Sequence, residues 1–249
     1  MFRGAGTVLN VLAVLAGSGV GVLLGHRLPQ RTRDTVTDAL GLVTLLIAVL
    51  SAMSVTDASL AAAVGDDAPV LIVLFALVLG GLAGSLLHVE RRLEGFGDLL
   101  RRRLTRGSPG DDSRQRFIEG FVTASLVFCV GPLTILGSLS DGLGNGAQQL
   151  ILKSVLDGFS SIAFAASLGI GVAASAVMVL GVQGSLTLLA ALLGAFVPEA
   201  HLLALTATGG VLLAGVGFRL LAVKAVPVAD LLPALLVAPL LVQLVTALR

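Results

Sequence analysis

Long runs of apolar residues, separated by short polar stretches, fill almost the whole chain. A helix needs roughly 20 apolar residues to cross a hydrocarbon core about 30 Å thick. The pattern predicts eight membrane-spanning helices, at about residues 4–25, 36–55, 68–89, 117–139, 149–172, 175–197, 202–222 and 229–248. Too little sequence remains between these spans for an extramembrane domain, so we expect an all-α polytopic membrane protein with a single transmembrane domain, residues 1–249.

The composition supports a membrane protein and argues against several other classes. The chain of 249 residues is 56% hydrophobic and 12% charged, with a mean hydropathy of +1.01, which is unusual for a soluble domain. A net charge of +1 gives no support for a nucleic-acid partner. Catalytic and phosphate-binding motifs are absent from the sequence, and its three histidines lack metal-ligand spacing. We therefore expect no enzyme, cofactor or bound metal.

Basic residues alternate between loops in a way that predicts orientation. With the N-terminus outside, thirteen of the 16 Lys and Arg residues fall in cytoplasmic loops, most of them in an Arg-rich loop at residues 90–116. This predicts that both termini lie outside. The acidic residues within the same loop favour a topology signal on a solvated amphipathic segment over a lipid head-group site.

Glycines concentrate in the first, third and fifth spans and predict close helix contacts, with a pore-lining role as the alternative. A shift of 150 residues sets Thr7–Val22 against Asp157–Val172, which suggests two four-helix halves in a parallel repeat. The halves are residues 1–116 and 117–249, or 1–139 and 149–249. An inverted repeat, in which spans one to three pair with six to eight, is the alternative.

The fourth span carries Gly131-Pro132 in its middle. Proline removes a backbone donor and clashes with the preceding turn, so we expect this span to be kinked or broken. Freed backbone groups cannot face lipid, and the hydroxyls of Thr134 and Ser138 lie just beyond the break. Interrupted helices are a recurring way to build ion and substrate sites. A packing kink satisfied by neighbouring helices is the alternative.

A glycine-rich stretch follows the broken span. Asp141-Gly142 and Asn145-Gly146 are most simply turn residues that close an outer hairpin. A mouth that attracts cations is the sharper alternative.

Two charges, Lys153 and Asp157, lie four residues apart near the start of the fifth span and therefore share a helix face. A carboxylate at that depth in a membrane is unfavourable unless it is paired or hydrated, which makes Asp157 a candidate functional residue. A purely structural pair, with Lys153 extended towards the interface, is the alternative. Asn10 in the first span is either an interhelical hydrogen-bond partner or part of the same site.

Four segments carry a family resemblance: GTVLNVLAVLAGSGVGVLLGHRLPQR, FCVGPLTILGSLSDGLGN, LKSVLDGFSSIAFAASLGIGV and LLPALL. The chain resembles the bacterial membrane family called domain of unknown function 554, the YdfK/YqgA group. The resemblance implies a bacterial inner-membrane protein of this length without a soluble domain, and it implies no substrate.

Two functional classes remain open from the sequence. The first is a channel or secondary transporter for a small ion or solute, with a cation favoured. Its path would lie near the broken fourth span and the Lys153/Asp157 pair. The second is a non-transporting scaffold or partner-binding membrane protein, in which the same polar residues only hold helices together. We also expect a homo-oligomer, because small glycine-rich bundles gain buried surface by association.

Overall fold

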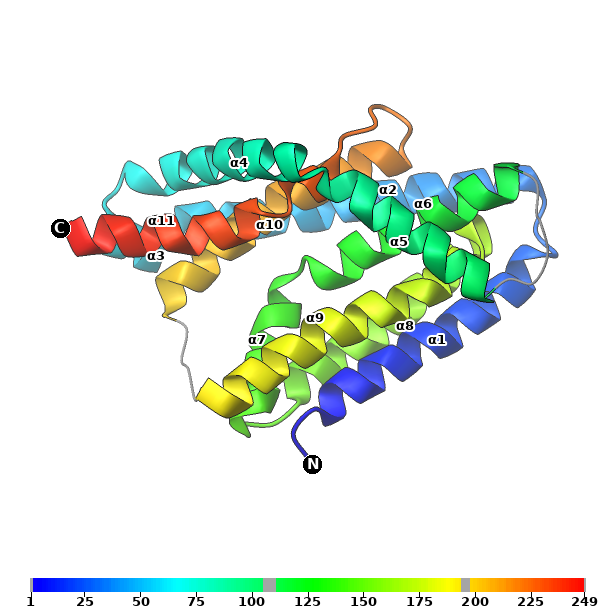
Figure 1. Cartoon of the computed structure of the whole chain (residues 1–249), viewed down its shortest axis with the longest axis horizontal. Coiled ribbons are helices and arrows are strands. Elements are labelled where there is room, and N and C mark those ends of the chain that lie inside the picture. Colours follow the sequence, from blue (N-terminus) through cyan, green and yellow to red (C-terminus); the bar gives the residue numbers. More distant parts are fainter. Residues whose placement is uncertain (1, 105–110, 194–197, 249) are drawn as a thin grey trace. The chain divides into compact units, whose positions relative to one another are not determined.

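The computed structural model describes residues 2–104, 111–193 and 198–248, and all its regular elements are helical (Figure 1). Seven spans are long and apolar enough to cross a membrane, and an eighth consists of two helices that meet at a bend. The all-α polytopic fold is therefore confirmed. The seven are α1 (Ala5–Gly25), α2 (Gln30–Ala52) with η1 (Met53–Thr56), α4 (Ala68–Leu87), α8 (Gln148–Leu168), α9 (Gly171–Leu193), α10 (Glu199–Leu220), and η2 (Val228–Leu231) with α11 (Ala234–Leu248).

Some helices differ from the hydropathy pattern. The second span begins at Gln30 and not near residue 36, because the polar residues after Pro29 continue the helix beyond its apolar part. A short helix, α3 (Ala58–Val64), follows η1. The Arg-rich segment, expected to be a loop, is helical over α5 (Val89–Leu104), where polar and apolar residues occupy opposite faces.

The helices group into two compact units. The first unit contains Met1–Leu40, Leu93–Cys129 and Leu133–Phe196, and the second contains Gly41–Arg92, Val130–Pro132 and Val197–Arg249. Both units therefore combine segments from distant parts of the sequence. The internal repeat stays a prediction.

In the first unit, α1 and α8 lie side by side and run parallel (Figure 1). A Cβ added to Gly17 would lie 2.2 Å from the carbonyl oxygen of Gly158, and one added to Gly21 would lie 2.3 Å from that of Ile162. Only glycine permits this approach, so the predicted close packing is confirmed for the first span.

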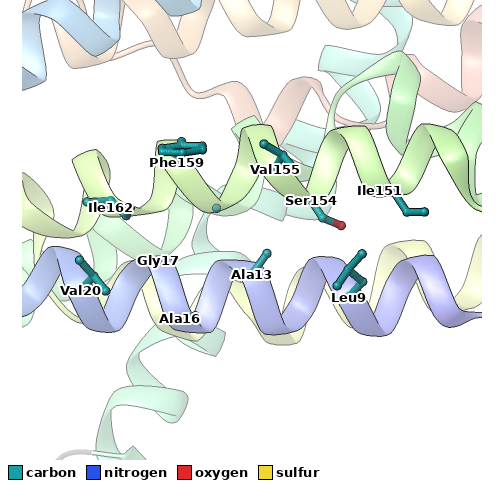
Figure 2. Close-up of a pocket in the computed structure, with 11 residues that line it drawn as sticks. Leu9, Ala13, Ala16, Gly17, Val20, Ile151, Ser154, Val155, Phe159 and Ile162 are labelled. Carbon is teal, nitrogen blue, oxygen red and sulfur yellow. The ribbon is translucent and has the colours of Figure 1, made fainter.

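An open groove of about 390 Å³ follows the α1/α8 pair (Figure 2). Its walls are apolar side chains such as Leu9, Val20 and Phe159. The hydroxyl of Ser154, which also lines it, donates to the carbonyl oxygen of Leu150 at 2.6 Å. Because this groove offers no free polar group, it is a poor place for an ion.

The bent span supplies the rest of the first unit. Its two helices are α6 (Asp111–Cys129) and α7 (Pro132–Leu143). Helix α6 packs parallel to α9, where Gly171 touches the backbone of Phe117. Helix α7 touches α8 through Gly137 and Leu150, and it touches α9 through Gly142 and Thr187. The interior of this unit therefore lies among α1, α6, α7, α8 and α9.

In the second unit, α4 runs antiparallel to η2 and α11 (Figure 1). A Cβ added to Gly84 would lie 1.9 Å from the carbonyl oxygen of Asp230, and one added to Gly80 would meet Ala234. Close packing is thus confirmed for the third span as well. The core of this unit is apolar and includes Leu60, Ile72, Ala76, Ala204, Ala238 and Val242.

Candidate functional site

The fourth span breaks at Gly131-Pro132, as its sequence predicts. Helix α6 ends at Cys129, α7 begins at Pro132, and their axes differ by 60°. Proline is well suited to the first position of a helix, because its missing N–H has no partner there in any case. The hydroxyl of Thr134 donates to the carbonyl oxygen of Phe128 at 3.0 Å. One carbonyl freed by the break is therefore satisfied inside the protein and not by lipid.

Lys153 and Asp157 form an ion pair in the interior of the first unit. Both are buried, with 5% and 7% of their surface exposed. Asp157 lies nine residues after the start of α8, about 13 Å along the helix at 1.5 Å per residue. The structure therefore pairs the two charges on one face of α8, as their spacing predicts.

Asn10 of α1 is the third member of this cluster. Its Nδ2 donates to Oδ2 of Asp157 at 2.9 Å, and Lys153 donates to the same oxygen. No described residue donates a hydrogen bond to Oδ1 of Asp157. Cys129, at the end of α6, lies within electrostatic range of both charges. The cluster therefore lies near the end of α6.

Several buried polar atoms of the first unit lack a hydrogen-bond partner among the described residues. Four side chains of the first unit that contribute such atoms are Asn10 (Oδ1), Ser125 (Oγ), Ser138 (Oγ) and Gln183 (Oε1 and Nε2). Ser138 and Gln183 are fully buried. Buried polar groups in native proteins almost always have partners, so these atoms indicate positions for water or an ion.

Helix α9 contributes two residues that the sequence did not single out as site residues. The hydroxyl oxygens of Thr187 and Thr7 lie 3.4 Å apart. Gln183 is one turn before Thr187 on α9, and Asn10 is about one turn after Thr7 on α1. Because the two helices are antiparallel, Gln183 and Asn10 lie at a similar level. The first and sixth spans thus both contribute to one polar interior.

Asp141 does not lie in the turn that the sequence predicts for Asp141-Gly142. It lies within α7 and not in a turn, and it is 4% exposed. Its Oδ2 accepts the backbone N–H of Gly6 at 3.1 Å, in the first turn of α1. Asp141 therefore satisfies one of the free donors at that helix start. The turn itself begins at Gly144, which has a φ of 84°.

The second unit has a separate polar cluster at helix ends. Arg219 donates to Oε1 of Glu90 at 2.7 Å, and the backbone N–H of Ala229 donates to Oε2 at 2.8 Å. The N–H of Glu90 in turn donates to Oδ1 of Asp230 at 2.8 Å. Both oxygens of Glu90 are thus engaged, and the cluster ties the start of α5 to the end of α10 and to η2.

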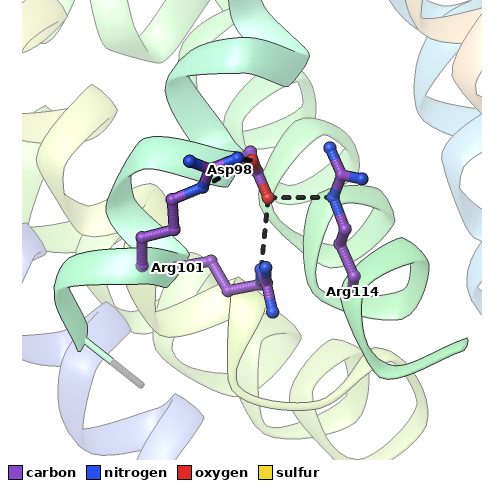
Figure 3. A network of polar contacts seen from close by, with 4 residues as sticks. Asp98, Arg101 and Arg114 are labelled. Atoms are coloured by element: carbon purple, nitrogen blue, oxygen red, sulfur yellow. Dashed lines mark hydrogen bonds and ion pairs between the residues drawn. The ribbon is translucent and has the colours of Figure 1, made fainter. Parts of the chain in front are cut away.

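The Arg-rich segment contains a third polar cluster, around Asp98 of α5 (Figure 3). Arg101, Arg102 and Arg114 approach its carboxylate at 3.2, 3.0 and 2.9 Å. Burial alone would raise the pKa of Asp98. The hydrogen bonds from Arg114 and Arg101, with the charges of Arg114 and Arg102, outweigh burial and lower that pKa below its ordinary value of 3.8. This cluster ties α5 to the start of α6.

The described residues include no group of three His, Cys, Asp or Glu side chains that could hold a metal ion. The structure thus has apolar helices of membrane-spanning length, and one of them, α8, carries a buried ion pair. These features define a multi-pass helical membrane protein.

Sequence comparison places the chain within that class. A model of the family "Protein of unknown function (DUF554)" matches residues 5–243, and the chain belongs to this family. It is similar to the uncharacterized protein YqgA of Escherichia coli (strain K12), with 34% identity over 94% of each chain. It is also similar to the uncharacterized membrane protein YdfK of Bacillus subtilis (strain 168), with 27% identity over 97% of each chain. No solved structure matches significantly.

Proposed function

We propose that the protein is a channel or secondary transporter for a small ion or solute, with a cation favoured. Its path would run through the polar interior of the first unit, beside the broken fourth span. One observation carries this proposal: the carboxylate of Asp157 is buried well inside a spanning helix, in a unit whose interior also holds oxygen atoms that lack partners among the described residues. Ionisable residues at such depth in a membrane protein usually mark a path for ions or protons.

The chemistry of the surrounding atoms favours a cation. Asp157, Asn10, Ser138 and Gln183 all offer oxygen acceptors, and oxygen is the ligand that hard cations prefer. The freed carbonyls at a helix break provide further acceptors of the same kind. A negatively charged solute would meet the Asp157 carboxylate and be repelled.

Lys153 would serve as the internal counter-ion. With the path empty, its ammonium neutralises Asp157 and removes the large penalty of an unpaired buried charge. An entering cation would compete with the ammonium for the carboxylate. The pair would thus allow binding and release without leaving Asp157 alone.

Cation flux into proteoliposomes tests the proposal. Asp157→Asn should abolish flux of K⁺, Na⁺ or H⁺, because the substitution keeps the shape of the side chain and removes its charge. Since it also leaves the buried Lys153 ammonium without its partner, flux is compared on protein shown to be folded. Asp66→Asn, which removes an exposed carboxylate outside the spans, is the matched control and should leave flux unchanged. Full flux in purified Asp157→Asn protein would refute the path through this cluster.

The alternative function is a scaffold or partner-binding protein with a purely structural Lys153/Asp157 pair. The two functions differ in water access to Asp157. In a Cys129→Ser background, Asp157→Cys should react readily with a polar thiol reagent if it lines a path. An inert cysteine in folded protein would favour the scaffold.

The orientation and assembly are further parts of the proposal. Sorting of the basic residues supports termini that lie outside the bacterial inner membrane. Reporter fusions at Gly144 and Ser108 should report opposite compartments, although Ser108 lies outside the described residues. A homo-oligomer should give a mass above that of one chain in mild detergent at several concentrations.

A further inference from the structure

A second cavity of the first unit, of about 230 Å³, lies where α1 and α8 end. Three basic side chains line it, and they come from three segments of the chain: His26 after α1, Arg33 on α2 and Arg116 on α6. The described residues that line the cavity include no Asp or Glu. The cavity is therefore positive, and it is separate from the Asp157 cluster.

The guanidinium groups in this cavity have free donors. Nε of Arg33 is buried without a hydrogen-bond partner, and neither Arg33 nor Arg116 forms an ion pair within residues 2–104, 111–193 and 198–248. The hydroxyl of Ser167 donates to the carbonyl oxygen of Arg33 at 3.2 Å, which fixes the Arg33 backbone against the end of α8. The side chain is thus positioned while its Nε donor remains unused.

A cation at a helix C-terminus often only complements the partial negative charge there. In that role Arg33 would donate hydrogen bonds to the last carbonyl groups of α1 or α8. Its Nε makes no such hydrogen bond to a described residue. Small residues such as Gly25, Ala166 and Gly169 line the same cavity and leave it open. Gly169 has a φ of 82°, which favours glycine, and the side chain of Arg116 passes over it at 4.0 Å from the position of a Cβ.

We propose that this cavity binds a phosphate group. Arginine presents a planar fork of donors that matches phosphate oxygens, and an imidazole N–H adds a further donor. Because the cavity lies at the ends of two spanning helices, at the level of lipid head groups, the phosphate belongs either to a phospholipid head group or to a free anion from solution.

Two arms of one experiment distinguish these sources, both with the full chain in nanodiscs. In the first arm, native mass spectrometry counts phosphatidylglycerol and phosphatidylcholine retained from a mixed bilayer. In the second arm, inorganic phosphate is titrated against thermal unfolding in phosphatidylcholine alone, with chloride at equal ionic strength as reference. Selective retention of phosphatidylglycerol identifies a lipid site, and a phosphate-specific rise in unfolding temperature identifies a free anion site.

Arg33→Gln should weaken whichever binding is seen by about tenfold or more, the usual effect of losing a charge-assisted hydrogen bond. The matched control is Arg31→Gln, which removes the same charge from an exposed position on the same helix and should bind normally. If Arg33→Gln does not fold, the exposed Arg116→Gln provides the same test. Equal weakening by Arg31→Gln, or no selectivity in either arm, would overturn the proposal.

Discussion

The two units hold a carboxylate in opposite ways. In the second unit both oxygens of Glu90 accept hydrogen bonds, and the cluster lies at helix ends. In the first unit both hydrogen bonds to Asp157 go to one oxygen, and the cluster lies within a helix near unpartnered polar atoms. A carboxylate whose two oxygens both accept hydrogen bonds stabilises the fold. A carboxylate with one oxygen unused can still bind a ligand.

The largest expected effect concerns the counter-ion of Asp157. Lys153→Met should lower the free energy of unfolding by about 3–5 kcal/mol, because it leaves a buried carboxylate unpaired. The double variant Lys153→Met/Asp157→Leu should recover most of that loss, since no charge remains. Unfolding in mixed detergent micelles measures both. Equal stability of Lys153→Met and the unmodified protein would show that Asp157 is already hydrated.

A smaller effect is expected in the second unit. Glu90→Gln should lower stability by about 1–2 kcal/mol, because it weakens two hydrogen bonds in a partly exposed cluster. Cation flux should stay unchanged, unlike in Asp157→Asn. Loss of flux in folded Glu90→Gln protein would contradict the contrast between the two clusters.

Two hydroxyls of α7 sharpen the contrast within the first unit. Thr134→Val should cost about 1 kcal/mol, because it leaves the carbonyl of Phe128 without its donor. Ser138→Ala removes a hydroxyl that has no described partner, so its stability should hardly change while flux falls. Unfolding and flux are measured for both variants. A loss of stability without a loss of flux in Ser138→Ala would show that Ser138 has a structural role.

The smallest effect concerns Asp98 in the Arg-rich segment. Because its pKa is lowered in the folded protein, its contribution to stability is present above the unfolded value of 3.8 and is lost as the pH falls through the folded pKa. Asp98→Asn should therefore be less stable than the unmodified protein at neutral pH, and the difference should shrink below pH 3.8. A difference that does not depend on pH would rule out a role for the charge.

Periodicity and spacing predict contacts within a helix better than contacts between helices. The eight spans, the break at Pro132 and the Lys153/Asp157 pair follow from local rules of length, proline geometry and i,i+4 spacing. The bond from Asn10 to Asp157 joins residues 147 positions apart, and such a partner is not contained in any local pattern. Gln183 could have been noticed as an uncharged polar residue in an apolar span, but its level beside Asn10 depends on packing.

The helicity of α5 and the position of Asp141 were missed for related reasons. Polar sequence was taken for a loop in the Arg-rich segment, although arginine, leucine and glutamate all favour helices. Asp141-Gly142 has the composition of a turn, yet tertiary contacts continue α7 through both residues.

The parallel packing of α1 against α8 also determines when the polar cluster can form. The partner of Gly17 is synthesised about 140 residues later, and at about 5–20 residues per second this delay lasts roughly 7–28 seconds. During that interval the glycine face of α1 and the amide of Asn10 must be covered by lipid or by the insertion machinery. Asp157 likewise emerges after the helix that donates to it. Assembly of the ion pair with Asn10 is thus a late event in biogenesis, and variants that weaken the α1/α8 contact should differ from the unmodified protein only after α8 has been synthesised.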